Sequence, residues 1–78
     1  MKNKIVTHFY VKEVKKDSKG EAPIYLRITV NGERAEISTN RRIKPDLWDK
    51  VSERVAGRGE AARVINSILN NTQVQFNI

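Results

Sequence analysis

The chain has 78 residues, which is enough for one small domain with a single hydrophobic core. It contains no cysteine and only one histidine, so it has no disulfide framework and no ligand spacing of the zinc or calcium kind. No apolar run approaches the roughly 20 residues of a membrane span, and no apolar secretory segment follows Met1, so the expected location is the cytoplasm.

The net charge of +6 is concentrated in the first part of the chain. Residues 1–44 contain eleven Lys or Arg residues against five Asp or Glu residues, whereas residues 45–78 contain four of each kind. A one-sided positive field attracts polyanions, because each neutralised phosphate releases condensed counterions. Nucleic acid is therefore the first partner to consider, and a merely well-solvated surface is the alternative.

The first predicted element is a strand over about residues 4–12, because Ile5–Val11 is dense in β-branched and aromatic residues. The polar stretch from Glu13 to Glu21 predicts an exposed loop. Residues 23–30 then alternate between apolar and polar side chains with period two, which predicts a second strand with one buried face.

Asn31-Gly32 predicts a tight hairpin turn, because both residues tolerate the positive φ angles of a type I′ turn. The third strand is then expected over about residues 33–39. A two-residue turn sets the cross-strand pairs by counting outward: Val30 with Glu33, Thr29 with Arg34, Ile28 with Ala35, Arg27 with Glu36, Leu26 with Ile37 and Tyr25 with Ser38. A slip by one residue would place Leu26 and Ile28 opposite charges, so the turn and the hydrophobic pattern favour the same register.

Two helices are predicted after the third strand. Pro45 suits a first helical position, which predicts a short helix over about residues 45–50, and the lone Trp48 is expected to pack as a core anchor. Gly57-Arg58-Gly59 predicts a break, followed by a longer helix over about residues 59–75. Side chains at spacings of three and four would form its buried stripe: Ala61, Ile65, Ile68, Leu69 and Thr72.

Together these elements predict one α+β domain over residues 1–78, a three-stranded antiparallel β-sheet packed against a carboxyl-terminal α-helix. The helix should cover the apolar sheet face, which holds Ile24, Leu26, Ile28, Ala35 and Ile37. The opposite face, here called the open face, should carry Tyr25, Arg27, Thr29, Arg34, Glu36 and Ser38. Whether His8, Tyr10 and Lys12 or their neighbours join it depends on the register of the first strand.

The sequence predicts no enzyme activity for this chain, no cofactor and no small-molecule substrate. It has no Cys nucleophile, no HExxH helix, no GxxxxGK[ST] loop and no GxSxG turn. Its closely spaced carboxylates, Asp46 with Asp49 and Glu33 with Glu36, are explained by helix-start and cross-strand roles.

The open face has the residue types that read duplex DNA. A β-sheet can enter the major groove, where Arg reads guanine and Thr can touch the thymine methyl. The predicted base-reading residues are Tyr25, Arg27, Thr29, Arg34, Glu36 and Ser38. The predicted phosphate contacts, which fix position without reading sequence, are Lys12, Lys15, Lys16, Lys19, Arg41 and Arg42. A plain cross-strand ion pair between Arg27 and Glu36 is the alternative role for those two residues.

Several segments, taken in order, resemble the arm-type DNA-binding domain that opens many tyrosine recombinases (integrases) of bacterial conjugative transposons and related mobile elements. The most specific are the strand Pro23-Ile24-Tyr25-Leu26-Arg27 with its Asn31-Gly32 turn, and Pro45-x-x-Trp48-Asp49. The resemblance extends to Phe9-Tyr10-Val11, Ile37-Ser38-Thr39 and Ala62–Leu69. In one departure, members often carry Gly before the segment that matches Arg42-Ile43, where this chain has Asn40-Arg41.

The resemblance implies that the sheet inserts into the major groove of double-stranded DNA at arm sites flanking a recombination core. The last helix would lead into core-binding and catalytic domains, so this chain would be the amino-terminal module of a recombinase. The parent protein would act in DNA integration at the bacterial nucleoid, with accessory recombination proteins as further partners.

Two other functions fit parts of the sequence. The exposed sheet edge and the terminal helix could serve protein interaction or self-association. Tyr10 and Tyr25 could stack single-stranded RNA bases, although the double-aromatic pattern of RNA-binding sheets is missing.

Overall fold

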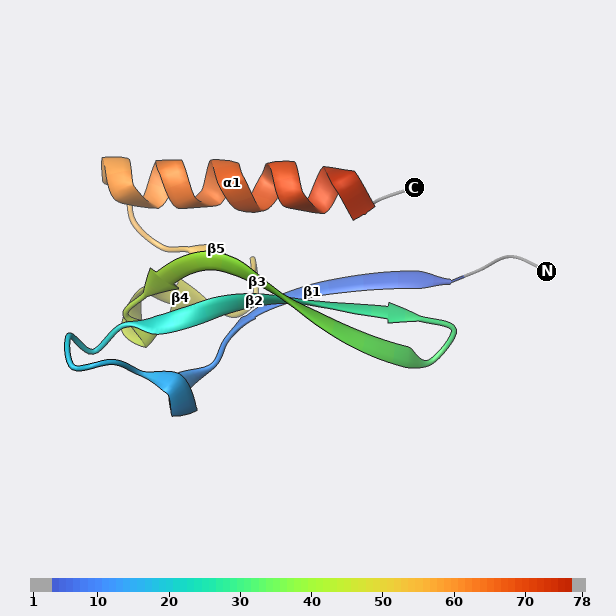
Figure 1. Cartoon of the computed structure of the whole chain (residues 1–78). Helices are drawn as coiled ribbons and strands as arrows, with labels where there is room; N and C mark the ends of the chain where they lie inside the picture. The colour runs from blue at the N-terminus through green and yellow to red at the C-terminus, as the bar shows by residue number, and fades with distance from the viewer. Residues whose placement is uncertain (1–3, 77–78) are drawn as a thin grey trace.

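A three-stranded antiparallel sheet with a helix on one face forms the body of the molecule. In the computed structural model, which describes residues 4–76, β1 (Ile5–Val11), β2 (Ala22–Val30) and β3 (Glu33–Ile43) pair in the order β1-β2-β3. α1 (Glu60–Phe76) lies along one side of this twisted sheet (Figure 1). The predicted α+β class is therefore confirmed. No helix among residues 4–76 is long and apolar enough to cross a membrane.

The β2–β3 hairpin has the register that the Asn31-Gly32 turn predicts. All six predicted pairs are present, from Val30 opposite Glu33 to Tyr25 opposite Ser38. Asn31 and Gly32 have φ angles of 52° and 88°, as a type I′ turn requires at its two central positions.

The register of β1 settles which of its side chains share the open face. Phe9 lies opposite Leu26, and both are buried, whereas Tyr10 lies opposite Tyr25 and His8 opposite Arg27. Because side chains alternate between the two faces of a strand, His8, Tyr10 and Lys12 join the open face rather than their neighbours.

β3 is longer than predicted, because a β-bulge lets it continue beyond residue 39. The register shifts between Ile24 and Tyr25, so that Ile24 pairs with Arg41 and the strand ends at Ile43. Asn40 adopts a φ angle of 62° at this bulge, a conformation that Asn tolerates better than most residues. The Thr39 hydroxyl donates a hydrogen bond to the Ile24 carbonyl at 2.8 Å, which bridges the two strands where the regular ladder is interrupted.

The segment after β3 begins with the predicted helical turn near Pro45–Trp48, but the helix does not continue to residue 50. Only a 3₁₀ turn, η2 (Pro45–Leu47), forms, and it leads into a two-stranded hairpin of β4 (Trp48–Asp49) and β5 (Arg54–Val55) that the sequence did not predict. A second 3₁₀ turn, η1 (Glu13–Lys15), lies in the β1–β2 loop. Trp48 is half-buried and packs against the core, as expected of an anchor.

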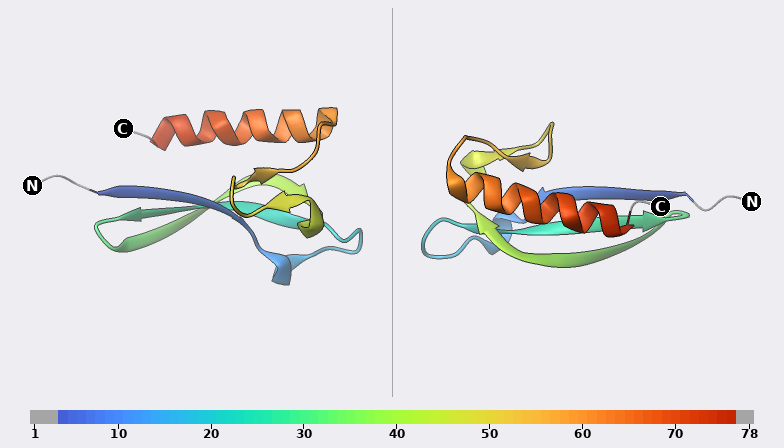
Figure 2. Two further views of the ribbon diagram at one scale, coloured as in Figure 1. Left: turned by 180° about the vertical axis from the view of Figure 1, so that it is seen from behind. Right: turned by 90° about the horizontal axis from the view of Figure 1, so that it is seen from above.

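The core lies between the sheet and α1, but it occupies only part of the sheet. Its residues are Phe9, Ile24, Leu26, Ile43, Val55, Ala62 and Leu69. Ala61, predicted in the buried stripe of the helix, is exposed, and its neighbour Ala62 is buried instead. Ala35 is exposed and Ile37 keeps 40% of its surface accessible, and both lie on β3, an edge strand of the sheet, whereas Leu26 on the central strand is fully buried. The β2–β3 turn extends beyond the end of α1 (Figure 2).

Polar contacts fix α1 to the small hairpin. The Arg54 guanidinium donates hydrogen bonds to Asn70 at 2.9 Å and to Gln73 at 2.7 Å, and it lies 5.2 Å from the centre of the Phe9 ring. Arg54 therefore joins the helix, the hairpin and β1 through one side chain.

Candidate nucleic-acid interface

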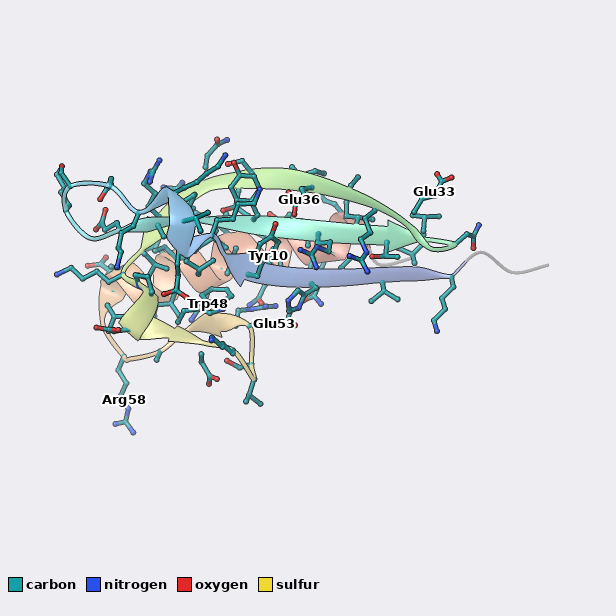
Figure 3. All side chains as sticks on the ribbon, turned by 90° about the horizontal axis from the view of Figure 1, so that it is seen from below. Tyr10, Glu33, Glu36, Trp48, Glu53 and Arg58 are labelled. Atoms are coloured by element: carbon teal, nitrogen blue, oxygen red, sulfur yellow. The ribbon has the colours of Figure 1, made fainter. Side chains whose placement is uncertain are left out.

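The open face is the side of the sheet turned away from α1. It includes His8 and Tyr10 from β1 and Lys12, which directly follows β1. Its other residues are Tyr25, Arg27, Thr29, Arg34, Glu36 and Ser38. Figure 3 looks onto this side and shows the labelled side chains of Tyr10, from β1, and Glu36, from β3, approaching each other across β2. Strand alternation thus brings all six predicted base-reading residues to one surface.

Glu36 is the centre of a polar cluster on the open face. Its carboxylate accepts a hydrogen bond from Lys12 Nζ at 2.8 Å and another from the Tyr10 hydroxyl. The Arg27 guanidinium lies 3.6 Å away, which confirms the predicted cross-strand ion pair. The hydrogen bonds from Lys12 and Tyr10 lower the pKa of Glu36 to about 2, and the bond to Glu36 raises the pKa of Lys12. Both groups are therefore charged at neutral pH.

Aromatic rings hold the cations of the open face in place. The Tyr10 ring stacks on His8 with a centroid separation of 5.9 Å, and the Arg27 guanidinium lies 4.8 Å from the same ring. Lys12 Nζ lies 4.0 Å above the Tyr25 ring. These distances are within the range of cation–π attraction, so the rings help to position the two cations that also pair with Glu36.

A basic hollow lies beside Tyr25, where the bulge of β3 meets the β1–β2 loop. It has a volume of about 360 Å³ and is lined by Lys15, Pro23, Tyr25, Ser38, Asn40, Arg41 and Arg42. The Arg42 guanidinium also lies 3.8 Å from an Asp17 carboxylate oxygen. Three of the predicted phosphate-contacting residues, Lys15, Arg41 and Arg42, are thus brought together.

The remaining predicted residues lie apart from these two clusters. Lys16 and Lys19 are exposed in the loop between η1 and β2 and take no part in the contacts around Glu36 or Tyr25. Thr29 and Arg34 face each other across the strands near the β2–β3 turn. Arg34 is exposed and forms no ion pair with any residue of the described part of the chain, so its guanidinium is available to a partner.

Sequence reasoning missed Glu53, which closes one side of the open face. Its carboxylate accepts a hydrogen bond from the Phe9 main-chain N–H at 2.9 Å and contacts His8 Nδ1 at 2.5 Å. Glu53 occupies the tight turn between β4 and β5 with a φ angle of 56°. Nothing in the sequence near Glu53 indicated this contact, because the hairpin that carries it has strands of only two residues.

The described residues offer little for other kinds of site. No three His, Asp or Glu side chains within residues 4–76 gather in a way that could hold a metal ion. A second hollow, of about 210 Å³, lies between β1 and the β4–β5 hairpin, where Tyr10, Glu13, Pro45, Trp48 and Lys50 contribute to its lining. Charge and hydrogen-bonding groups are instead concentrated on the open face and in the basic hollow.

Comparison with known proteins agrees with this distribution of charge. A family model described as Arm DNA-binding domain matches residues 9–77. The match covers the end of β1, from Phe9 to Val11, and all of β2, β3, the β4–β5 hairpin and α1. No curated protein and no solved structure matches the chain.

Proposed function

The chain belongs to the Arm DNA-binding domain family, and we propose that its open face enters the major groove of duplex DNA and reads a specific sequence there. DNA is the partner that this family membership gives, and the domain is a non-catalytic module. The observation that carries the proposal is the placement of Tyr25, Arg27, Thr29 and Arg34 on one exposed sheet surface, clear of the helix.

The dimensions of the sheet fit this mode of binding. Strands in a sheet are spaced about 4.8 Å apart, so the outer two of three strands lie roughly 10 Å apart. The major groove is about 12 Å wide and admits β-strands. The β2–β3 turn extends beyond α1, so the helix leaves this end of the hairpin uncovered for insertion.

The basic residues at the other end of the sheet suit the DNA backbone. Lys15, Arg41 and Arg42 surround the hollow beside Tyr25, and Lys16 and Lys19 extend from the adjoining loop. Contacts from such cations to phosphates position a protein on the duplex without reading bases. This arrangement would leave base reading to the centre of the sheet.

The resemblance of the sequence to recombinase arm domains supports a more specific role. We infer that the DNA bound is an arm site and that the parent protein is a tyrosine recombinase acting in DNA integration. Catalysis would then lie in a different domain of that parent protein, and this chain would supply recognition.

The test measures binding of the chain to a duplex selected from a randomised library and to a scrambled duplex. Arg27→Ala and Arg34→Ala should each lose about 1–3 kcal/mol on the selected duplex only. Lys16→Ala should weaken binding to both duplexes and reduce the salt slope by about 1. The control is Arg58→Ala, since the side chain of Arg58 points away from the sheet (Figure 3) and should not matter.

Equal affinity of the unmodified chain for the selected and scrambled duplexes would exclude sequence-specific reading. Self-association through α1 or a sheet edge is the competing function. It predicts a concentration-dependent mass in analytical ultracentrifugation that does not respond to salt, whereas DNA binding weakens steeply as salt rises.

A further inference from the structure

We propose that Arg27 and Glu36 act as one unit that reads a single G·C base pair, with the guanidinium on guanine and the carboxylate on cytosine. This inference rests on the proposed major-groove binding and goes further by naming the base pair. It assigns a recognition role to an acidic side chain on a surface that otherwise attracts a polyanion.

The two side chains present donors and an acceptor next to each other. Arg27 and Glu36 are direct cross-strand partners on β2 and β3, and Arg27 NH2 lies 3.6 Å from Glu36 Oε2. In the major groove a G·C pair presents the acceptors N7 and O6 on guanine and the amino donor N4 on cytosine. O6 and N4 are hydrogen-bonded to each other within the pair and so lie about 2.9 Å apart. The protein pattern and the base-pair pattern are therefore complementary in order and similar in spacing.

The surroundings of Glu36 keep its carboxylate in place for this contact. Lys12 donates to Oε1 and the Tyr10 hydroxyl donates to Oε2, so both oxygens are held from the β1 side of the sheet. An ionised carboxylate has about four lone-pair sites, so each oxygen can accept another hydrogen bond. Lys12 and Arg27 also offset the negative charge, which reduces repulsion between Glu36 and the phosphates.

The Tyr10 ring orients the other member of the unit. It holds the Arg27 guanidinium 4.8 Å from its centre, and Glu36 holds the same group from the β3 side. Arginine binds guanine best with two parallel hydrogen bonds, which need a fixed orientation of the planar group.

The other base pairs fit the unit less well. A reversed pair would place the carboxylate against the N7 and O6 acceptors of guanine and the guanidinium against the cytosine amino group. In an A·T pair, with the guanidinium on adenine, the carboxylate would meet the thymine O4 acceptor or its methyl group, with no donor to accept from. In the T·A orientation the carboxylate could accept from adenine N6, but the guanidinium would find one acceptor, thymine O4, where guanine offers two. Glu36 should therefore disfavour the reversed pair and the A·T pair, and Arg27 the T·A pair.

The decisive experiment changes one atom group on the DNA. Binding of Arg27→Ala to variants of the selected duplex first identifies the G·C pair whose replacement no longer changes the affinity. The unmodified chain is then titrated with the selected duplex. The cytosine of that pair is then replaced by N4-methylcytosine, which still pairs with guanine but carries a methyl group where Glu36 would accept. We expect about a tenfold loss of affinity for the unmodified chain, as for a good base contact.

Two variants separate base reading from charge. Glu36→Ala and Glu33→Ala each remove one carboxylate from β3, so both should bind the scrambled duplex more tightly at low salt. Only Glu36→Ala should bind the normal and the N4-methylated duplex equally, and only it should tolerate other pairs at that position. Circular dichroism spectra confirm that each variant is folded before titration.

Three results would overturn the inference. They are an unchanged affinity of the unmodified chain for the N4-methylated duplex, full sensitivity to the methyl group in Glu36→Ala, and the lack of any G·C position that depends on Arg27. In these cases sequence-specific binding itself would still be observed. A failure of the proposed function appears instead as equal binding to all duplexes.

Discussion

The side-chain amide of Asn66 pairs with the main chain of Val55 as a neighbouring strand would. Asn66 Oδ1 accepts a hydrogen bond from the Val55 N–H at 2.8 Å, and Asn66 Nδ2 donates to the Val55 carbonyl at 3.0 Å. Val55 is buried, so neither main-chain group can readily bond to water instead. Helix α1 is thus joined to β5 by two specific hydrogen bonds in addition to apolar packing.

Asn66→Ala should therefore lower the free energy of unfolding by about 1–3 kcal/mol, because it leaves two buried main-chain groups without partners. Urea denaturation followed by circular dichroism measures the change. Asn71→Ala is the matched control, since Asn71 is exposed on the same helix. Ala favours helix over Asn, so the control should be as stable as the unmodified chain or slightly more stable.

The Glu36 cluster should make stability depend on pH in the acid range. The pKa of Glu36 falls from an ordinary 4.5 to about 2 in the folded chain, through hydrogen bonds from Lys12 and Tyr10. A lowered carboxyl pKa stabilises the fold fully above pH 4.5, and this contribution disappears as the pH falls toward 2. Glu36→Gln should therefore flatten the decline in stability between these values.

Urea denaturation at a series of pH values provides the measurement for Glu36. Tyr10→Phe and Lys12→Met test the two hydrogen bonds to Glu36 separately, because each removes one hydrogen-bond donor while keeping most of the side chain. Each should move the Glu36 pKa back toward 4.5, which carboxyl carbon shifts in NMR spectra report directly. High salt should reduce the effect, since the cluster is partly exposed. If the free energy of unfolding falls with acid as steeply in Glu36→Gln as in the unmodified chain, the lowered pKa of Glu36 is contradicted.

Glu53 should protect one amide on the outer edge of the sheet. β1 is an edge strand, and its Phe9 N–H donates to Glu53 Oε1 rather than to another strand. Glu53→Ala should speed hydrogen exchange at the Phe9 amide, because that N–H then has no acceptor. Glu53→Gln retains an oxygen acceptor and is expected to keep much of the protection. Exchange rates that do not differ between these two variants would show that the contact does not persist in solution.

Asn40 should tolerate glycine better than any other substitution. Its φ angle of 62° is in the left-handed region, which costs most residues about 1–2 kcal/mol. Asn40→Gly should leave the free energy of unfolding nearly unchanged, whereas Asn40→Val should lower it by at least about 1 kcal/mol. Thermal denaturation of the two variants compares them, and equal losses would mean that the bulge relaxes to another conformation.

The central hairpin could be predicted from sequence because two independent signals coincide there. The Asn31-Gly32 turn sets the count, and the alternation on both strands supports the same pairs. For β1 the sequence did not decide which side chains belong to the open face. Either His8, Tyr10 and Lys12 or their neighbours could lie there, since each set includes residues that suit a sheet. Burial of Phe9 against Leu26 decided between them.

Other features lacked such signals. β4 and β5 are too short to show alternation of apolar and polar residues, so the hairpin that positions Glu53 could not be predicted from the sequence. In α1 the side turned to the hairpin carries Asn66, Asn70 and Gln73, whose partners are polar, so apolar spacing alone selected Ala61 instead of Ala62. At the bulge of β3, Asn40 has a positive φ angle, and the one sequence signal there was the Gly that members of the resembling family often carry where this chain has Asn40-Arg41.

The contacts of Tyr10 bear on the thermodynamics of recognition. Its ring contacts both the His8 ring and the Arg27 guanidinium, and its hydroxyl bonds to Glu36, so it restrains three side chains in the free domain. Ordering a flexible side chain on binding costs about 0.5–1.5 kcal/mol, and the Tyr10 contacts incur part of this cost during folding. Tyr10 can therefore strengthen binding without touching a base, and its removal should appear in calorimetry as a larger entropic penalty.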